Sequence, residues 1–185
     1  MEININQKSI SIGDKYKIFV DGQELYRAAR KLFRLLPVVV LYKNDGDIPR
    51  MTIRKRFTFF KASYVLERED SSIVEFKTIS FWKRHYQCLV GKDMYDVYGH
   101  RGRKFSIYKN NVQVAFWDKK AVSWFAGDNY VIVADKNSDV ELFISFCLVI
   151  DNFRSDDHDG KALTVDIGSI GPQAKAFDTN WEPKV

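Results

Sequence analysis

Leu142-Phe-Ile-Ser-Phe-Cys-Leu-Val-Ile150 is an apolar run that only Ser145 interrupts. Ser138-Asp-Val-Glu141 precedes it with the spacing of a capping box, so we predict one helix over residues 139–153. On a helix these apolar side chains cover every side, and a helix without a polar face has to be buried on every side. The run is shorter than the roughly 20 residues that cross a bilayer. We therefore expect the rest of the chain to enclose it.

A repeated pattern fills the chain before this run. A basic residue, apolar residues two apart, a short break and a Tyr- or Val-led strand recur, and the copies begin at Lys8, Lys31, Lys55, Lys77 and Lys120. The starts lie 23, 24, 22 and 43 residues apart, and the last interval is about two units. Such a unit holds two short strands and their turns, whereas a propeller blade needs about 40–45 residues. Each copy is therefore predicted to start a pair of strands.

Apolar residues within the copies predict which face of each strand is buried. Ile79 and Phe81, for example, lie two apart, the period of a strand with one buried face. Turn residues separate the strands, among them Asp21-Gly22 and Asn110-Asn111. Many short strands with regular turns indicate a sandwich or a barrel, and a barrel leaves no open edge. Because the helix needs cover on all sides, we predict a β-rich (β+α) fold, a closed antiparallel β-barrel around it.

Residues 23–36 allow two interpretations. Their apolar residues have helical spacing, their basic residues lie on the opposite face, and Asp21-Gly-Gln-Glu24 has the spacing of a capping box. Taken alone, the segment is a basic amphipathic helix of the kind that lies on membranes. The repeat predicts strands instead, with a pair beginning at Lys31. We favour strands because the neighbouring copies constrain the segment.

The composition fits one globular domain that is mildly basic. Of the 185 residues 45% are apolar, and the formal net charge is +5, which favours anionic partners only weakly. Cys88 and Cys147 provide no disulfide framework, so a reducing, cytoplasmic location is expected. The first residues carry no signal peptide, and no membrane span is expected.

The order and spacing of several motifs resemble the tubby-like superfamily of tubby C-terminal domains, phospholipid scramblases and LURP-one-related proteins. The likeness is closest to the small LURP-one-related, scramblase-like proteins, and the motifs are residues 8–18, 21–22, 41–46, 53–55, 64–66, 95–98 and 142–151. This resemblance implies a barrel of about twelve strands around a central hydrophobic helix. It covers residues 7–154, so we expect a barrel domain over 1–154. The polar tail over 155–185 lies outside the pattern and is expected to pack on the barrel.

Catalytic and metal-binding patterns are absent from the sequence, so we expect no enzyme activity, no cofactor and no metal. His85, His100 and His158 lie far apart in different expected elements and lack ligand spacing. Neither cysteine has the sequence context of a nucleophile. No motif for nucleic-acid recognition is present either.

The run Asp135-Lys-Asn-Ser-Asp-Val-Glu141 places oxygen ligands at alternate positions, as a calcium loop does. Scramblases are described as having a calcium-binding segment beside the corresponding helix. However, Val140 stands where such a loop needs glycine, and Phe146 stands where it needs a bidentate glutamate. A turn followed by a helix cap explains the same residues.

Basic residues remain as candidates for binding, because tubby domains, which are similar in fold, bind phosphoinositide head groups through basic residues. Arg54 and Arg56 alternate with apolar residues and should point outward, and further cations at expected turns are Lys83, Arg84, Arg101, Arg103 and Lys104. We expect a non-enzymatic binding module, peripheral at a membrane, for an anionic phospholipid surface or a protein partner. Alternatives are scramblase-like lipid translocation, a small-ligand carrier, and an enzyme of unknown reaction. The oligomeric state stays open. The other interpretation of these cations is an ordinary solvated surface without a binding role.

Overall fold

The computed structural model describes residues 1–8, 15–31, 38–56, 63–120, 129–156 and 173–185. Two helical elements occur in these ranges, the 3-10 turn η1 (Arg101–Arg103) and the helix α1 (Val140–Asp156). The strands are β1 (Glu2–Lys8), β2 (Lys15–Val20), β3 (Gln23–Lys31), β4 (Val38–Lys43), β5 (Pro49–Arg56), β6 (Ser63–Arg68), β7 (Ile73–Ser80), β8 (His85–Val90), β9 (Asp93–Gly99), β10 (Lys104–Lys109), β11 (Val112–Lys120) and β12 (Asn129–Ala134).

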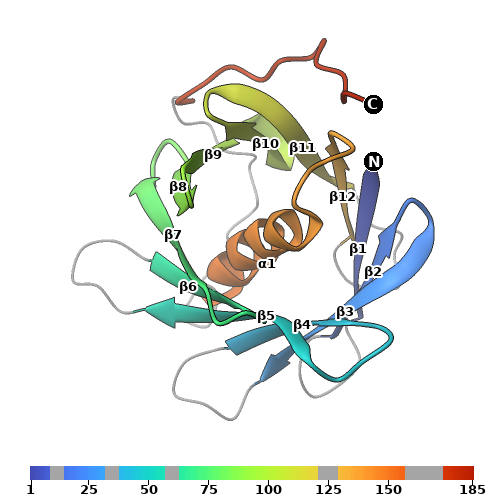
Figure 1. Ribbon diagram of the computed structural model, residues 1–185. Coiled ribbons are helices and arrows are strands. Elements are labelled where there is room, and N and C mark those ends of the chain that lie inside the picture. Colours follow the sequence, from blue (N-terminus) through green and yellow to red (C-terminus); the bar gives the residue numbers. More distant parts are fainter. Residues whose placement is uncertain (9–14, 32–37, 57–62, 121–128, 157–172) are drawn as a thin grey trace.

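The strands form one closed antiparallel barrel. Each strand pairs with its neighbours in the chain, and β1 also pairs with β12, which closes the sheet. Figure 1 shows α1 in the middle of the ring of strands. The predicted fold class is therefore confirmed, and so is the number of about twelve strands that the resemblance implied.

Two-residue turns join several strands at the points where the sequence predicts them. Asp21 and Gly22 both have positive φ, 48° and 84°, and so do Asn110 and Asn111, with 50° and 67°. Positive φ at both central residues is the geometry of the hairpin turn whose twist matches that of the flanking strands. Asn, Asp and Gly adopt it at least cost, which is why these residues fix the strand register there.

The preferred interpretation of residues 23–36 is confirmed for the described part, because Gln23–Lys31 is strand β3; residues 32–36 lie outside the described ranges. The strand pairs along its length with β2 on one side and β4 on the other. A helix at this place would leave β2 and β4 each with one unpaired edge and open the barrel. Backbone pairing has overridden the helical spacing of the apolar side chains.

The repeat predicts the spacing of the strand pairs correctly, but it places the start of each pair wrongly. Lys8, Lys31 and Lys120 are the last residues of their strands, so the basic residue marks the end of the first strand in a pair. The buried face was also wrong in one copy: Phe76 and Thr78 are buried on β7, whereas Ile79 and Phe81 are exposed. On β7 the alternation of buried residues therefore begins before Lys77, the residue at which the motif begins. The other copies' apolar pairs 10 and 12, 57 and 59, and 122 and 124 lie outside the described residues.

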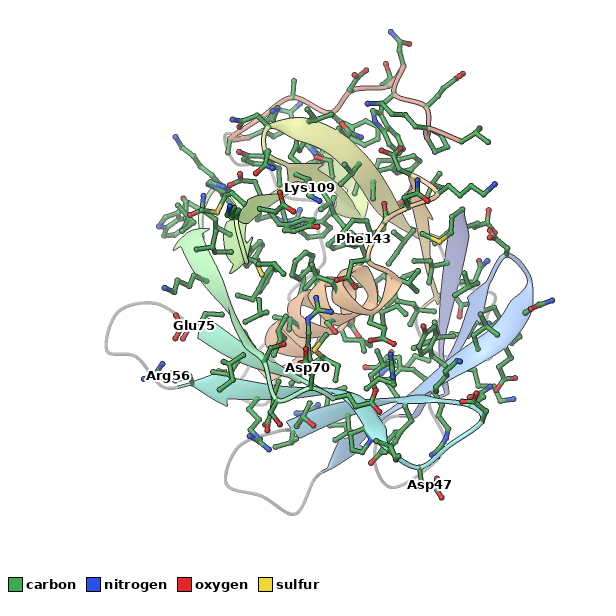
Figure 2. The ribbon with its side chains drawn as sticks, viewed as in Figure 1. Asp47, Arg56, Asp70, Glu75, Lys109 and Phe143 are labelled. Atoms are coloured by element: carbon green, nitrogen blue, oxygen red, sulfur yellow. The ribbon has the colours of Figure 1, made fainter. Side chains whose placement is uncertain are left out.

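Helix α1 provides the centre of the core. Residues 142–150 are all buried, and Phe146 stacks on Phe76 of β7 with 4.8 Å between ring centroids. Figure 2 shows Phe143 pointing from α1 into the space between helix and strands. The cap differs from the predicted one: Asp139, not Ser138, accepts the hydrogen bond of the Leu142 amide, at 3.0 Å. The helix therefore begins at Val140, one residue later than predicted.

The expected tail over 155–185 is only partly described. Residues 155 and 156 still belong to α1, and residues 157–172, which include His158, lie outside the described ranges. Residues 173–185 lie along the outside of the barrel, over β10 and β11 (Figure 1). Trp181 donates its indole N–H to the backbone carbonyl of Gln113, at 3.1 Å.

Candidate functional site

The two ends of the barrel differ, and α1 distinguishes them. It begins at the rim where each even-numbered strand turns into the next odd-numbered strand, and we call this end the helix-start rim. It ends at the rim where the odd-numbered strands end and the even-numbered strands begin, which we call the helix-end rim. There Tyr16 of β2 and Tyr130 of β12 both donate hydrogen bonds to the carboxylate of Asp151, and the Tyr16 bond is 3.2 Å long. These bonds fix the point at which the helix leaves the barrel.

Basic residues gather at the helix-end rim. Among the residues whose side chains the structure describes, the strand ends and connections place these cations there: Arg30, Lys55, Arg56, Lys77, Lys83, Arg84, Arg101 and Lys104. Fewer acidic side chains lie close to this rim within the part of the chain that the structure describes, among them Glu75, Asp118 and Asp151. A rim dominated by one sign of charge attracts ions and surfaces of the opposite sign.

The helix-start rim has the opposite composition. Its acidic residues are Glu2, Asp21, Glu24, Asp45, Asp47, Glu69, Asp70, Asp93, Asp135, Asp139 and Glu141. Its cations are Lys43, Arg50, Arg68, Lys92, Lys109, Lys136 and Lys184. Among the described residues charge is therefore separated along the barrel axis, although the net charge of the chain is modest.

Cations of the helix-start rim are largely neutralised by their neighbours. Arg50 Nε lies 2.8 Å from Glu141 and a guanidinium nitrogen of Arg68 lies 2.6 Å from Asp139, so both arginines hold the start of α1. Lys109 lies 2.8 Å from Asp93, and this hydrogen bond lowers the pKa of the Asp93 carboxyl. These ion pairs leave little positive charge for a partner at this end.

The turn between β7 and β8 projects an aromatic side chain at the helix-end rim. Trp82 is 82% exposed, and Phe81, 54% exposed, meets its ring edge to face. The amide of Lys83 donates to Ser80 Oγ at 3.3 Å, which helps to shape the turn. Together the two exposed rings form an apolar patch, and such patches are typical of contact surfaces.

Arg84 joins this turn to the connection between β9 and β10. Its guanidinium carbon lies 4.3 Å from the centroid of the Phe105 ring, and it donates to the His100 carbonyl at 3.0 Å. The Gly99 amide in turn donates to the Arg84 carbonyl at 2.8 Å. The two connections form one unit, which carries Trp82, Lys83 and Arg101 on its surface. In the described ranges neither Lys83 nor Arg101 forms an ion pair.

Several described residues with catalytic or metal-binding potential have structural roles. Among the described residues no group of histidine, cysteine and carboxylate side chains has the arrangement of a metal site. Asp139 caps α1, and Asp135 accepts a hydrogen bond from the Lys184 amide at 2.7 Å. Burial raises the pKa of the Cys88 thiol to about 12, so this group stays protonated and is a poor nucleophile.

Comparison with known families agrees with the architecture. The model of the LURP-one-related family matches residues 1–151, which covers all twelve strands and most of α1. The chain belongs to the LURP-one-related family. This family is part of the tubby-like superfamily, so the resemblance predicted from the motifs is confirmed. No curated protein and no solved structure matches the chain.

The basic candidates of this LURP-one-related protein separate into two groups. Arg54 and Arg56 are exposed on β5, but Arg54 pairs with Glu67 at 2.6 Å and Arg56 with Glu75 at 2.8 Å. Figure 2 shows Arg56 and Glu75 close together on the outside of the barrel. Lys77 and Arg56 together lower the pKa of the Glu75 carboxyl, with the Lys77 hydrogen bond as the larger cause.

Other candidates meet at the helix-end rim. Lys83, Arg84 and Arg101 lie on the two connected turns, and Lys104 begins β10 beside them, 3.8 Å from Asp118. Arg103 belongs to η1 between them. The structure therefore brings Lys83, Arg84, Arg101 and Lys104 together, whereas Arg54 and Arg56, the latter at the end of β5 on the same rim, are engaged with acidic partners.

Sequence reasoning missed two features of this LURP-one-related barrel, the exposed Trp82 and the basic rim. The repeat contained a signal for the rim, because a lysine that recurs with the period of a hairpin has to fall on the same end of an up-and-down barrel. Trp82 had no such signal, since its exposure depends on the end point of β7. No helix in the described part of the chain has the length and apolar character to cross a membrane.

Proposed function

We propose that this protein is a non-enzymatic binding module that docks on anionic phospholipid surfaces through its helix-end rim. The observation that carries the proposal is the exposed indole of Trp82 beside two cations, Lys83 and Arg101, that have no ionic partner in the described ranges. Such cations are free to pair with lipid head groups. An indole partitions into the interface between a bilayer and water, where its apolar ring is buried and its N–H remains hydrated.

Electrostatics supports the orientation of docking. A basic residue close to an anionic leaflet contributes about 1 kcal/mol of attraction, and this rim offers many of them. The acidic helix-start rim then faces away from the membrane. Ionic attraction of this kind weakens as salt screens it, so binding is expected to fall with ionic strength.

Alternative functions have less support from the geometry. Lipid translocation through α1 would need its apolar surface to leave the barrel, yet residues 142–150 are buried among the strands. A ligand carrier would need interior space, and the side chains of α1 and the strands form one continuous core there. Docking on a protein partner remains a possible outcome of the experiment below.

The test is flotation with vesicles of phosphatidylcholine alone and vesicles that also contain phosphatidylserine. The full chain is compared with the double variant Lys83→Glu/Arg101→Glu and with the matched control Lys92→Glu/Lys136→Glu. Both variants change the net charge equally, but Lys92 and Lys136 lie on the helix-start rim. We expect the first variant to lose at least about tenfold in affinity for anionic vesicles, and the control to retain it.

Two results would contradict lipid docking. If the full chain shows no preference for anionic vesicles at low salt, a protein is the only partner left for the rim. Equal losses in both double variants would show that net charge matters and the rim does not. Trp82→Ala adds a further readout, because removal of an exposed side chain should weaken binding without lowering the melting temperature.

A further inference from the structure

The C-terminal segment 173–185 is held on the barrel wall mainly by its side chains. The ammonium of Lys175 lies 3.6 Å from the centroid of the Tyr108 ring on β10 and 5.5 Å from that of Tyr98 on β9. A cation placed between two aromatic faces is attracted by the negative potential of the rings. This slot is the first of three places where the segment inserts a side chain.

Two aromatic side chains occupy the other places. The Phe177 ring meets His100 edge to face at 5.1 Å and Phe116 of β11 at 5.7 Å. The Trp181 ring also meets Phe116 edge to face, at 5.8 Å, and its indole donates to the Gln113 carbonyl at 3.1 Å. The three insertions follow the pattern Lys-x-Phe-x-x-x-Trp. Between them they cover an aromatic surface on the outer wall of β9, β10 and β11, formed by Tyr98, Tyr108 and Phe116, and we call this covered surface the groove.

The groove has the chemistry of a recognition site. The outer wall of a soluble barrel is ordinarily polar, yet here it presents Tyr98, Tyr108 and Phe116. Gln113 is 6% exposed, and its amide nitrogen has no hydrogen-bond acceptor among the described residues. A buried donor without a partner is costly. The tail therefore leaves one polar group of the groove for a different ligand to satisfy.

We propose that this groove binds an extended peptide segment of a partner protein, with a lysine two residues before one aromatic side chain and a second aromatic four residues after it. The chain's own tail is the intramolecular occupant that such a partner displaces. The groove lies on the part that matches the LURP-one-related family, whereas the tail lies beyond residue 151, where that match ends. The partner differs from the tail in offering an acceptor to Gln113.

Competition makes the proposal measurable. An occupant on the same chain acts at a high effective concentration, so a free peptide binds weakly while the tail is seated. Removing the aromatic anchors of the tail weakens the competitor and leaves the groove unchanged. The affinity of an added peptide that shares only the three anchor residues with the tail should then rise.

The experiment measures fluorescence anisotropy with a labelled synthetic peptide that has Lys, Phe and Trp at this spacing and Gly or Ser elsewhere. The proteins are the full chain and the full-length variant Phe177→Ala/Trp181→Ala. We expect the peptide to bind the variant at least about tenfold more tightly than the wild type. Replacing the lysine of the peptide by glutamate, or scrambling its order, should abolish binding.

Two outcomes overturn the proposal. If only a peptide with the complete sequence of residues 173–185 binds the variant, the tail is a piece of the fold and the groove recognises nothing else. If the wild type forms dimers in light scattering that the peptide dissociates, the occupant is the tail of a second copy. If the double variant has a lower melting temperature than the wild type, Lys175→Glu is used instead to weaken the binding of the tail. The same rise in peptide affinity is expected.

Discussion

Arg84 crosses Gly99 so closely that a Cβ atom on residue 99 would lie 2.6 Å from the Arg84 Cβ. No contact of this kind occurs in real structures, so the glycine is needed for the two turns of the helix-end rim to meet. Arg84 itself has a positive φ of 49°, a strained conformation for a residue with a side chain. The rim is thus built on a close approach of the Arg84 side chain to the Gly99 backbone, which the surrounding structure maintains.

The first prediction concerns this crossing. Gly99→Ala should lower the free energy of unfolding by about 1–3 kcal/mol, because the new methyl group overpacks the crossing. Chemical denaturation measures the change. Gly46→Ala is the control, since the nearest atom to its new Cβ is 4.0 Å away. Adding Arg84→Gly removes the clashing Cβ and relieves the positive φ, so the double variant should lose less than the sum of the single variants.

The second prediction separates the two roles of Asp139, which caps α1 and pairs with Arg68. Asp139→Asn keeps a capping oxygen but removes the charge, whereas Asp139→Ala removes both. We expect the alanine variant to lose about 1 kcal/mol more than the asparagine variant in the free energy of unfolding. Asp47→Asn breaks an ion pair whose carboxylate is 98% exposed, and it should change stability by less than about 1 kcal/mol. Equal losses in both Asp139 variants would contradict a capping role.

The third prediction tests the helix as the centre of the core. Phe146→Ala removes a fully buried ring that stacks on Phe76, and we expect a loss of about 3–5 kcal/mol in the free energy of unfolding. Leu89→Ala on the barrel wall, 54% exposed, should cost less than about 1 kcal/mol. Similar small losses in both variants would mean that α1 does not fill the barrel.

The fourth prediction concerns pH and His100, which lies under the tail. Burial lowers the pKa of His100 and the charge of Arg84 lowers it further, while the nearby Gln173 side chain and Lys175 backbone oppose this only in part. A folded pKa below the unfolded value of about 6.5 means that the stabilisation is complete above that pH and is lost as pH falls through the folded pKa. Hydrogen exchange of residues 173–185 should therefore speed up at acid pH, after correction for intrinsic rates.

His100→Gln is the control for this pH effect, because glutamine is polar but does not titrate. In this variant the protection of residues 173–185 should vary little between neutral and mildly acidic pH. His85, which lies 2.8 Å from Asp96 on the wall, is present in both proteins and cancels in the comparison. The same pH dependence in both proteins would show that His100 does not control the tail.

Much of the fold was predictable from local patterns. The helix followed from residues 142–150, because an apolar surface on every side allows only complete burial. The turns followed from Asp21-Gly22 and Asn110-Asn111, whose positive φ angles few other residues adopt. The buried face of β7 did not follow. Ile79 and Phe81 alternate like core residues, but the strand keeps Phe76 and Thr78 inside.

The sequence alone thus determined a closed barrel around one helix and the family of the protein. The apolar helix and the period of the hairpins are both local properties of the chain, so they can be recognised without its tertiary structure. Only the tertiary structure decided which cations stay available: Arg54 and Arg56 meet Glu67 and Glu75, whereas Lys83 and Arg101 meet no acid in the described ranges. It also decided that the tail lies in an aromatic groove. The physical reason is that these contacts join residues far apart in the chain, and strand register, which no single segment contains, determines them.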